Sequence, residues 1–268
     1  MLNCSALPTD RPDKKMQSFS VIGLVIYTIA SAVVGVRLLI RANRSHGLPE
    51  LLAGLSYIGA PALGYPLAIV SSQLSNRAVA TPLYLVGETS LVFGCCCFLF
   101  FTVKVFRPSA YWALVLAAIG SAVLTGSGLG IIHSWLAYTD PLEVTAHART
   151  PLALMVGVLL LSYVWTALEG FRYYRMMRKR MALGMADAVV TNRFLLWTLS
   201  GLCSMAWISV SAIMLAMGYN LARNPINVSV TCAGGILNTV FLVLIFMPPA
   251  AYTRWVHRSA RAPQLATA

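Results

Sequence analysis

A single carboxylate lies deep within an apolar stretch of the sequence. Glu88 falls about eight residues into the apolar segment 80–103, roughly 12 Å along a helix that rises about 1.5 Å per residue. A charged side chain is costly in lipid, so Glu88 is expected to face the interior of a helix bundle. Tyr84 lies one helical turn earlier on the same face, and His133 is expected at a similar depth as a partner. Glu88 could line a functional cavity or serve as a structural hydrogen-bonding group.

Asn238 and Thr239 form a second deep polar pair, in the middle of the apolar segment 227–248. Amide and hydroxyl side chains at that depth bind a solute or tie neighbouring helices together. The sequence therefore predicts a path for a solute or ligand that is lined by Glu88, Tyr84, His133, Asn238 and Thr239.

Other charged residues lie near the ends of the apolar segments and could form ion pairs or a gate. Glu169 is one helical turn from Arg172, which predicts an interfacial ion pair, with an inner gate as the functional alternative. Glu50 and Asp187 each lie at the start of an apolar segment. A carboxylate there suits the positive end of the helix dipole and accepts from free amides. Nearby arginines, among them Arg37, can also pair with these carboxylates.

Enzymatic and cofactor chemistry is not expected. Motifs of the HExxH and GxSxG types are absent, and so is a pair of aspartates within one membrane segment. The histidines are scattered, which disfavours bis-histidine haem ligation. The consecutive cysteines 95–97 point in three directions on a helix and cannot converge on one metal ion, so we expect them to be packing residues. We therefore expect no enzyme activity, no metal and no cofactor.

The composition indicates that the solvent of this chain is a bilayer. Hydrophobic residues make up 58% of the 268 residues and charged residues 10%, whereas a soluble domain carries about 25% charged residues. The apolar runs are continuous rather than alternating, which favours helices over a closed barrel. We expect an all-α integral membrane protein, a seven-transmembrane-helix bundle, with spans at 17–39, 51–72, 80–103, 110–134, 151–172, 194–218 and 227–248.

The basic residues predict the orientation of this bundle. Fourteen of the 20 lysines and arginines fall in the links after the first, third and fifth spans and in the C-terminal tail, and six fall on the other side. Because the basic side of a membrane protein is cytoplasmic, we expect the N-terminus outside and the C-terminus inside a plasma membrane. The net charge of +12 is then mostly an orientation signal with attraction to anionic lipid, and no nucleic-acid partner is expected.

Two passages of the sequence occur twice. The basic link in 35–52 matches 170–190, at offsets of 135 to 137, and "PSAY" (108–111) parallels "PAAY" (249–252) at an offset of 141. Ordered matches with slowly drifting offsets indicate a duplicated three-helix unit with the fourth span as the joint. Three spans reverse the direction of the chain and the joint reverses it again, so both units share one orientation and form a parallel repeat.

The duplication predicts a division of the chain into five parts. These are an outer tail 1–16, a first unit 17–109, a linker helix with an outer loop 110–150, a second unit 151–251 and a cytoplasmic tail 252–268. The layout is similar to that of the SWEET sugar facilitators and also resembles the seven-helix rhodopsin-like bundles. A retinal pigment needs a lysine in the seventh span for its Schiff base, and 227–248 contains none.

Two functions fit these features. The first is a transporter or facilitator for an unidentified small solute, which works by alternating access between the two units, and we favour it because transport is the commoner task of a small polytopic protein. The second is a ligand-sensing receptor with an outer-half pocket, whose basic link "RYYRMMRKR" (172–180) is an output surface for an acidic cytoplasmic partner. A scaffold that only packs against other chains is a third option. Polar residues along the whole bore favour transport, whereas polar residues in the outer half alone favour a receptor.

Overall fold

The computed structural model describes residues 14–221 and 224–265, and all of its regular structure is helical. Seven helices are long and apolar enough to cross a membrane. They are Val21–Ser45, Leu48–Gln73, Arg77–Phe106, Tyr111–Ala137, Leu142–Ala182, Ala188–Ala216 and Pro225–Phe246. The predicted seven-helix membrane bundle is therefore confirmed.

The helices follow one another along the chain with short links. In order they are α1 (Lys14–Ser45), α2 (Leu48–Tyr57), the π-helix η1 (Ile58–Gly64), α3 (Tyr65–Gln73), α4 (Arg77–Phe106), α5 (Tyr111–Ala137), α6 (Pro141–Ala182), α7 (Ala188–Ala216), α8 (Pro225–Phe246) and α9 (Ala250–Leu265). The second span is thus one rod made of α2, η1 and α3. The loop expected before residue 151 is instead helical, because Asp140 caps α6 and Pro141 takes its first turn.

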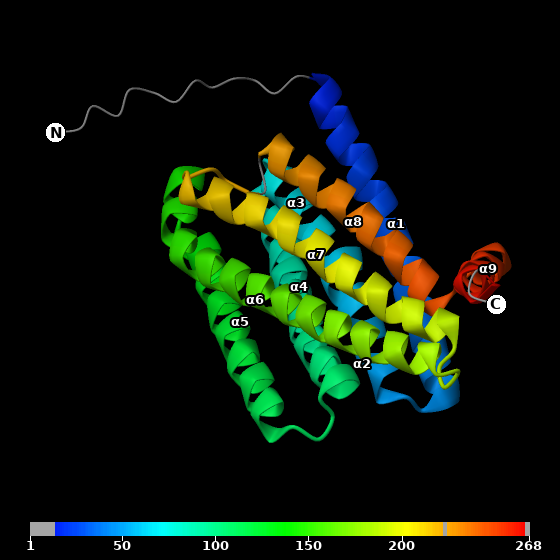
Figure 1. Ribbon diagram of the computed structural model, residues 1–268. Helices are drawn as coiled ribbons and strands as arrows, with labels where there is room; N and C mark the ends of the chain where they lie inside the picture. The colour runs from blue at the N-terminus through cyan, green and yellow to red at the C-terminus, as the bar shows by residue number, and fades with distance from the viewer. Residues whose placement is uncertain (1–13, 222–223, 266–268) are drawn as a thin grey trace.

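The spans pack in chain order and close into a ring. Each span contacts the next one along the chain, and α8 packs against α1. The helix α5 lies at the flank of the bundle between α4 and α6, which touch each other much less (Figure 1). We call the end at which α2, α5 and α7 begin the basic end, and the end at which α4, α6 and α8 begin the mouth end.

The π-helix in the second span accommodates Pro61. A proline inside a helix lacks an amide hydrogen and disturbs the hydrogen-bond ladder, and a π-turn is one way to absorb it. Inside a membrane the irregular backbone needs a partner, and the hydroxyl of Ser90 on α4 donates to the carbonyl of Gly59 at 3.0 Å. Close contact with α4 is possible because Gly59 meets Gly94 there, backbone against backbone.

The interior of the basic end is filled with aromatic and aliphatic side chains. We call this set the aromatic cluster; its buried members are Val34, Leu38, Ala53, Phe98, Phe101, Phe106, Leu196, Trp197, Leu242 and Ile245. Phe101 lies 5.2 Å from Trp197 between ring centroids, and Trp197 meets Phe246 edge to face at 5.8 Å. Such offset and edge contacts are the favourable arrangements of aromatic rings. This half of the described bundle therefore has a packed apolar core.

The chain after the last span forms a helix of its own. The helix α9 turns away from α8 and packs against α7 (Figure 1). Val256 of α9 is buried in that contact, and the amide of Asn192 donates to the hydroxyl of Tyr252. The tail expected at 252–268 therefore begins as an ordered part of the basic end.

We expect Gly94→Ala to destabilise the protein by about 1–3 kcal/mol, because overpacking of a tight contact has that cost. A methyl group at position 94 would collide with the backbone nitrogen of Ala60 and lie 2.9 Å from the carbonyl carbon of Gly59. The measurement is the melting temperature of the purified protein in lipid nanodiscs.

The matched control is Gly126→Ala, since nothing lies within 4 Å of a methyl group at that position. Alanine is a better helix former than glycine, so this control should keep or slightly raise the melting temperature. Equal losses in both variants would show that the contact between the second span and α4 is not tight.

Candidate functional site

A cavity of about 500 Å³ lies inside the ring and is lined by residues from all seven spans. It reaches the surface at the mouth end, beside the exposed residues Leu74, Ser75 and Thr139. At its inner end the cavity meets the aromatic cluster, because Phe98 belongs to both and Tyr57 lines the cavity and packs against the cluster. We call it the central cavity.

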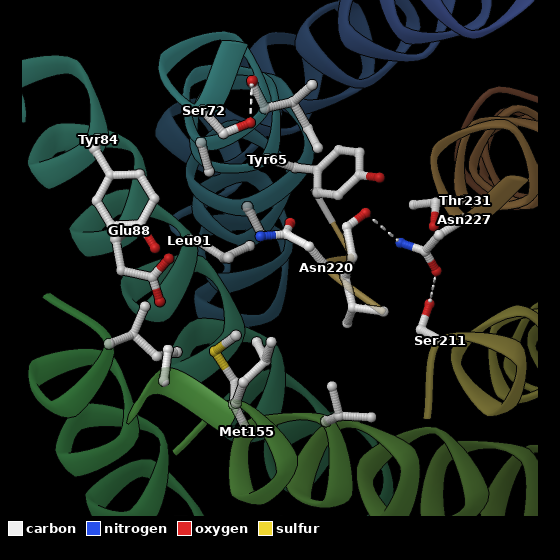
Figure 2. A pocket seen from close by; sticks show the side chains of 18 of the residues that line it. Tyr65, Ser72, Tyr84, Glu88, Leu91, Met155, Ser211, Asn220, Asn227 and Thr231 are labelled. Carbon is white, nitrogen blue, oxygen red and sulfur yellow. Dashed lines mark hydrogen bonds between the residues drawn. The ribbon is translucent and has the colours of Figure 1, made fainter. Parts of the chain in front are cut away.

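Glu88 and Tyr84 both line the central cavity, on α4. Glu88 is 3% exposed, and its Oε1 has no hydrogen-bond partner among the described residues. The ring of Tyr84 stacks on Trp135 of α5, with centroids 4.1 Å apart and planes inclined by 12°. Figure 2 shows Tyr84 and Glu88 side by side on one wall. An unpaired carboxyl group therefore lies in the cavity next to an aromatic pair.

The predicted partnership between Glu88 and His133 is wrong. His133 is exposed and lines a separate groove between α5 and α6. The cavity-facing residues of α5 are Ile131 and Trp135, which are four positions apart and share a face. Position 133 is rotated by about 200° from position 131 at roughly 100° per residue, and so it points away from the cavity. Depth was not sufficient to predict contact, because the rotation of the helix decided it.

The wall opposite Glu88 carries a neutral polar group around Asn227 (Figure 2). Its Oδ1 accepts from the hydroxyl of Ser211 at 2.7 Å, and its Nδ2 donates to the carbonyl of Leu221 at 3.0 Å. Tyr65 and Thr231 lie close by in the same view. This group was not among the predicted site residues, and Asn227 stands at the very start of the predicted span 227–248. The structure gives the capping role to Asn224, whose side chain accepts from the amides of residues 226 and 227.

Arg77 lies at the mouth and connects α4 to the end of α5. Its guanidinium donates to the backbone carbonyls of Trp135, Tyr138 and Thr139, and it lies 5.5 Å from the centre of the Trp135 ring. The carbonyls at the C-terminus of a helix are its negative end, so a cation is favoured there. Arg77 is thus engaged in structure and does not neutralise Glu88.

Asn238 and Thr239 have different environments although they are adjacent. Asn238 lines the floor of the central cavity, and its Oδ1 accepts from the hydroxyl of Ser200 on α7. Thr239 is buried outside the cavity lining, and its hydroxyl donates to the carbonyl of Gly235 one turn earlier, at 2.9 Å. Only the asparagine of this predicted pair is placed to meet a ligand.

Glu169 pairs with Arg107 and not with Arg172, so the predicted partner is wrong. The Nε of Arg107 lies 2.7 Å from Oε1 of Glu169, whose side chain is 8% exposed. Arg172 is exposed on the surface of α6. Arg107 is the capping residue at the C-terminus of α4, and the packing of α4 against α6 brings it to the buried carboxylate. The sequence of α6 alone could not predict this contact. This ion pair lies at the basic end beyond the cavity and joins α4 to α6.

The remaining charged residues of the predicted gate form separate contacts, and none lines the central cavity. Arg37 donates to the sulfur of Met247 at 3.2 Å. Glu50 lies in the first turn of α2, where Gly47 is the capping residue, and its Oε1 is 3.8 Å from Arg41. Asp187 caps α7, with Oδ1 accepting from the amides of residues 189 and 190 at 2.8 and 3.1 Å.

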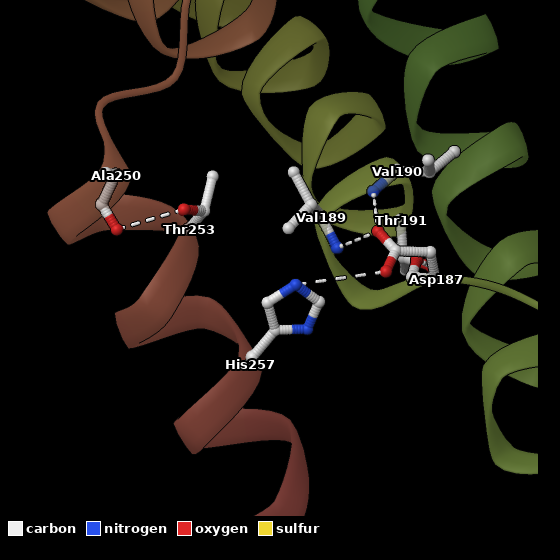
Figure 3. A network of polar contacts seen from close by, with 7 residues as sticks. All are labelled: Asp187, Val189, Val190, Thr191, Ala250, Thr253 and His257. Atoms are coloured by element: carbon white, nitrogen blue, oxygen red, sulfur yellow. Dashed lines mark hydrogen bonds and ion pairs between the residues drawn. The ribbon is translucent and has the colours of Figure 1, made fainter.

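The second oxygen of Asp187 faces the C-terminal helix. It lies 4.0 Å from Nε2 of His257 on α9 (Figure 3). Asp187 thus does two things at the basic end: it starts α7, as the sequence indicated, and it meets α9.

No group of three or more histidine, cysteine, aspartate or glutamate residues within 14–221 and 224–265 is placed to hold a metal ion. The described cysteines are free thiols: Cys95, Cys96, Cys97, Cys203 and Cys232. The described lining of the central cavity offers one carboxyl group, one guanidinium at the mouth, one thiol, neutral polar groups and aromatic rings.

We expect Arg107→Gln to destabilise the protein by about 1–3 kcal/mol, because it leaves a buried carboxylate without its charged partner. Arg172→Gln is the matched control and should have almost no effect, since that side chain is exposed. Adding Glu169→Gln to Arg107→Gln should restore part of the loss. Melting temperatures in nanodiscs give the comparison, and a larger loss for Arg172→Gln than for Arg107→Gln would contradict the pairing.

Comparison with known proteins gives no relative from which a function could be carried over: no family model, curated protein sequence or solved structure matches this chain.

Proposed function

We propose that this chain is a ligand-sensing membrane protein of the receptor type. It binds a small, mostly apolar molecule in the central cavity and carries the response to its basic end. The observation that supports this most directly is the division of the interior. The cavity opens at the mouth end, and the other half of the ring is filled by the aromatic cluster.

The depth of the polar residues separates the two functions considered above, and it favours a receptor. Glu88, Asn227 and Asn238 line the cavity between the mouth and its floor. In the basic half, the deepest hydroxyls belong to Thr102 and Thr166, which lie 3.2 Å apart. Each is also bonded to a carbonyl of its own helix, at 3.0 and 2.9 Å. These groups join α4 to α6 and offer no path to a solute.

The size of the cavity suits a small organic molecule. Ligand pockets usually have volumes of about 300–1,000 Å³ and mostly apolar walls with a few fixed polar groups. The central cavity, at about 500 Å³, is lined largely by aromatic and aliphatic side chains. Glu88 on one wall and Asn227 on the other are the polar points that could orient an occupant (Figure 2).

Some residues of the cavity also contact the aromatic cluster and so link the two halves. Phe98 lines the cavity and belongs to the cluster, while Tyr57 and Tyr163 line the cavity and pack against the cluster. A ligand that moves these rings changes the packing of the basic end. Because packed interiors are bistable rather than continuously deformable, small shifts at such rings can be passed on as discrete changes.

The basic end provides a surface for the response. The helix α6 continues to Ala182 and carries a run of exposed cations: Arg172, Arg175, Arg178, Lys179 and Arg180. We place this end on the cytoplasmic side of a plasma membrane, because the excess of lysine and arginine lies on that side. An acidic partner or anionic lipid is the complement of such a surface.

Transport remains the second candidate, and one set of observations favours it. The helices α4 and α8 end alike: Arg107 has φ −142° and ψ 52°, Met247 has φ −136° and ψ 55°, and each donates to the carbonyl four residues earlier at 2.8 Å. Both helices also begin at an asparagine cap, Asn76 and Asn224. Matching ends support a duplicated unit, which is the architecture of many transporters. However, α5 lies between the two three-helix units on one side of the ring. A rocking motion of one unit against the other would have to separate the units there.

The two functions predict different labelling of single cysteines in a background without the six native cysteines. For a receptor, we expect Glu88→Cys to react with a membrane-impermeant thiol reagent from the mouth side only. Thr102→Cys should react from neither side, because Thr102 is buried in the packed half of the bundle at the basic end. The measurement is labelling in whole cells and in inverted vesicles.

Ser75→Cys and Arg178→Cys are the controls, since both residues are exposed and lie at opposite ends of the bundle. Each should react from one side only, which also fixes the orientation. Reaction of the cysteine at position 88 from both sides, or of that at position 102 from the basic side, would contradict the receptor and support alternating access.

A further inference from the structure

None of the described residues that line the central cavity supplies a counter-charge to the carboxyl group of Glu88. Among those described lining residues, Glu88 is the only carboxylate and Arg77 the only permanent cation. Arg77 is held at the mouth by three carbonyls of the α5 terminus. A buried charge is stable only when it is paired or well hydrogen-bonded, and the described protein residues do not provide this for Oε1 of Glu88.

The asparagine side chains that line the cavity are already engaged. Asn227 uses both ends of its amide, on Ser211 and on the carbonyl of Leu221. Asn238 is bonded to Ser200 on the floor. Glu88, in contrast, is 3% exposed and its Oε1 has no partner among the described residues. The hydroxyl of Tyr65 and Nε1 of Trp207 also lack a partner among the described residues, but both are neutral groups. Glu88 is the lining carboxyl group that needs a donor.

The surroundings of Glu88 suit a cation that carries an apolar body. Tyr84 lies beside the carboxyl group, stacked on Trp135 (Figure 2). Elsewhere the walls of the cavity include Tyr65, Tyr163 and Trp207. The faces of aromatic rings attract ammonium groups, and recognition of organic ammonium ligands commonly combines such rings with a carboxylate. A metal ion would need further ligands, and no group that could supply them is found within the described residues.

We propose that the ligand of the central cavity is an organic amine, whose ammonium group binds Glu88 beside the Tyr84–Trp135 pair while its apolar body fills the aromatic interior. This inference rests on the proposed function, since it names the chemical class of the molecule that the cavity binds. It also explains why a carboxylate is placed at this depth in a bilayer, where its cost is high.

The test compares phenylalkylamines of increasing chain length with the phenylalkanols of equal length. The full chain is reconstituted in nanodiscs, and binding is followed by tryptophan fluorescence, because Trp135 and Trp207 line the cavity. We expect the best amine to bind at least about tenfold more tightly than its alcohol, since a hydrogen bond to a charged group contributes more than one between neutral groups. In Glu88→Gln this preference should disappear, while the binding of the alcohol stays the same.

Two further variants make the result specific. Glu143→Gln removes an exposed carboxylate at the start of α6, outside the cavity lining, and should keep the preference for the amine. Ala148→Trp fills the mouth part of the lining and should abolish the binding of amines and alcohols alike.

Several results would overturn the inference. Equal affinity for amine and alcohol, both lost in Ala148→Trp, would reject the amine and leave the proposed function standing. A preference that persists in Glu88→Gln, or one that is lost in Glu143→Gln, would also reject it, because the carboxyl group would not be the determinant. Absence of binding by every probe would reject this ligand class, and the cysteine labelling would then judge the proposed function independently.

Discussion

The structure depends on one constraint, which is that a polar group inside a bilayer must find its partner within the protein. Most of the buried hydroxyls meet it locally: Thr198 and Ser162 donate to carbonyls one turn earlier, at 2.9 and 2.6 Å. This bonding uses no neighbouring helix, so a residue such as serine or threonine can be placed almost anywhere on a span. Carboxylates have no such local solution. Glu169 finds Arg107 on another helix, whereas Oε1 of Glu88 finds no partner within the described residues, so these two residues reveal more about the bundle than the hydroxyls do.

The same constraint explains why the cavity lies where it does. The second span can include Pro61 only because α4 approaches it closely and Ser90 satisfies a carbonyl of the π-helix. That approach needs glycine on both sides, as at Gly59 and Gly94. The tight contact fixes α4 against the second span and presents Glu88 to the interior. The helix α5 then covers the other flank of α4, where a side chain at position 128 would approach both Val92 and the carboxyl group of Glu88.

Much of the fold follows from local properties of the sequence. The number of spans and the capping of α7 by Asp187 depend on apolar length and on the chemistry of one turn. The interior position of Glu88 follows from the cost of exposing it to lipid. The contacts of His133, Glu169 and Asn227 did not follow, because each depends on the rotation of a helix or on a neighbour distant in sequence. On α5, His133 lies two positions from the cavity-lining residues Ile131 and Trp135. That difference is enough to make its side chain exposed instead of placing it beside Glu88.

An incomplete carboxyl group in a cavity links binding to conformation. A ligand that binds one arrangement of the bundle better than another shifts the equilibrium by the difference in affinity. A cation beside Glu88 makes this difference in affinity large, because the attraction between the two charges is strong only where water is excluded. Tyr84 and Trp135 hold the mouth side of that site through their stacking, and Arg77 holds Trp135 to the start of α4. On the far side, Phe98 connects the cavity to the aromatic cluster. In the proposed complex, a cation on Glu88 would lie between the Tyr84–Trp135 pair at the mouth and the rings of the aromatic cluster at the basic end, which is the placement that a sensor requires.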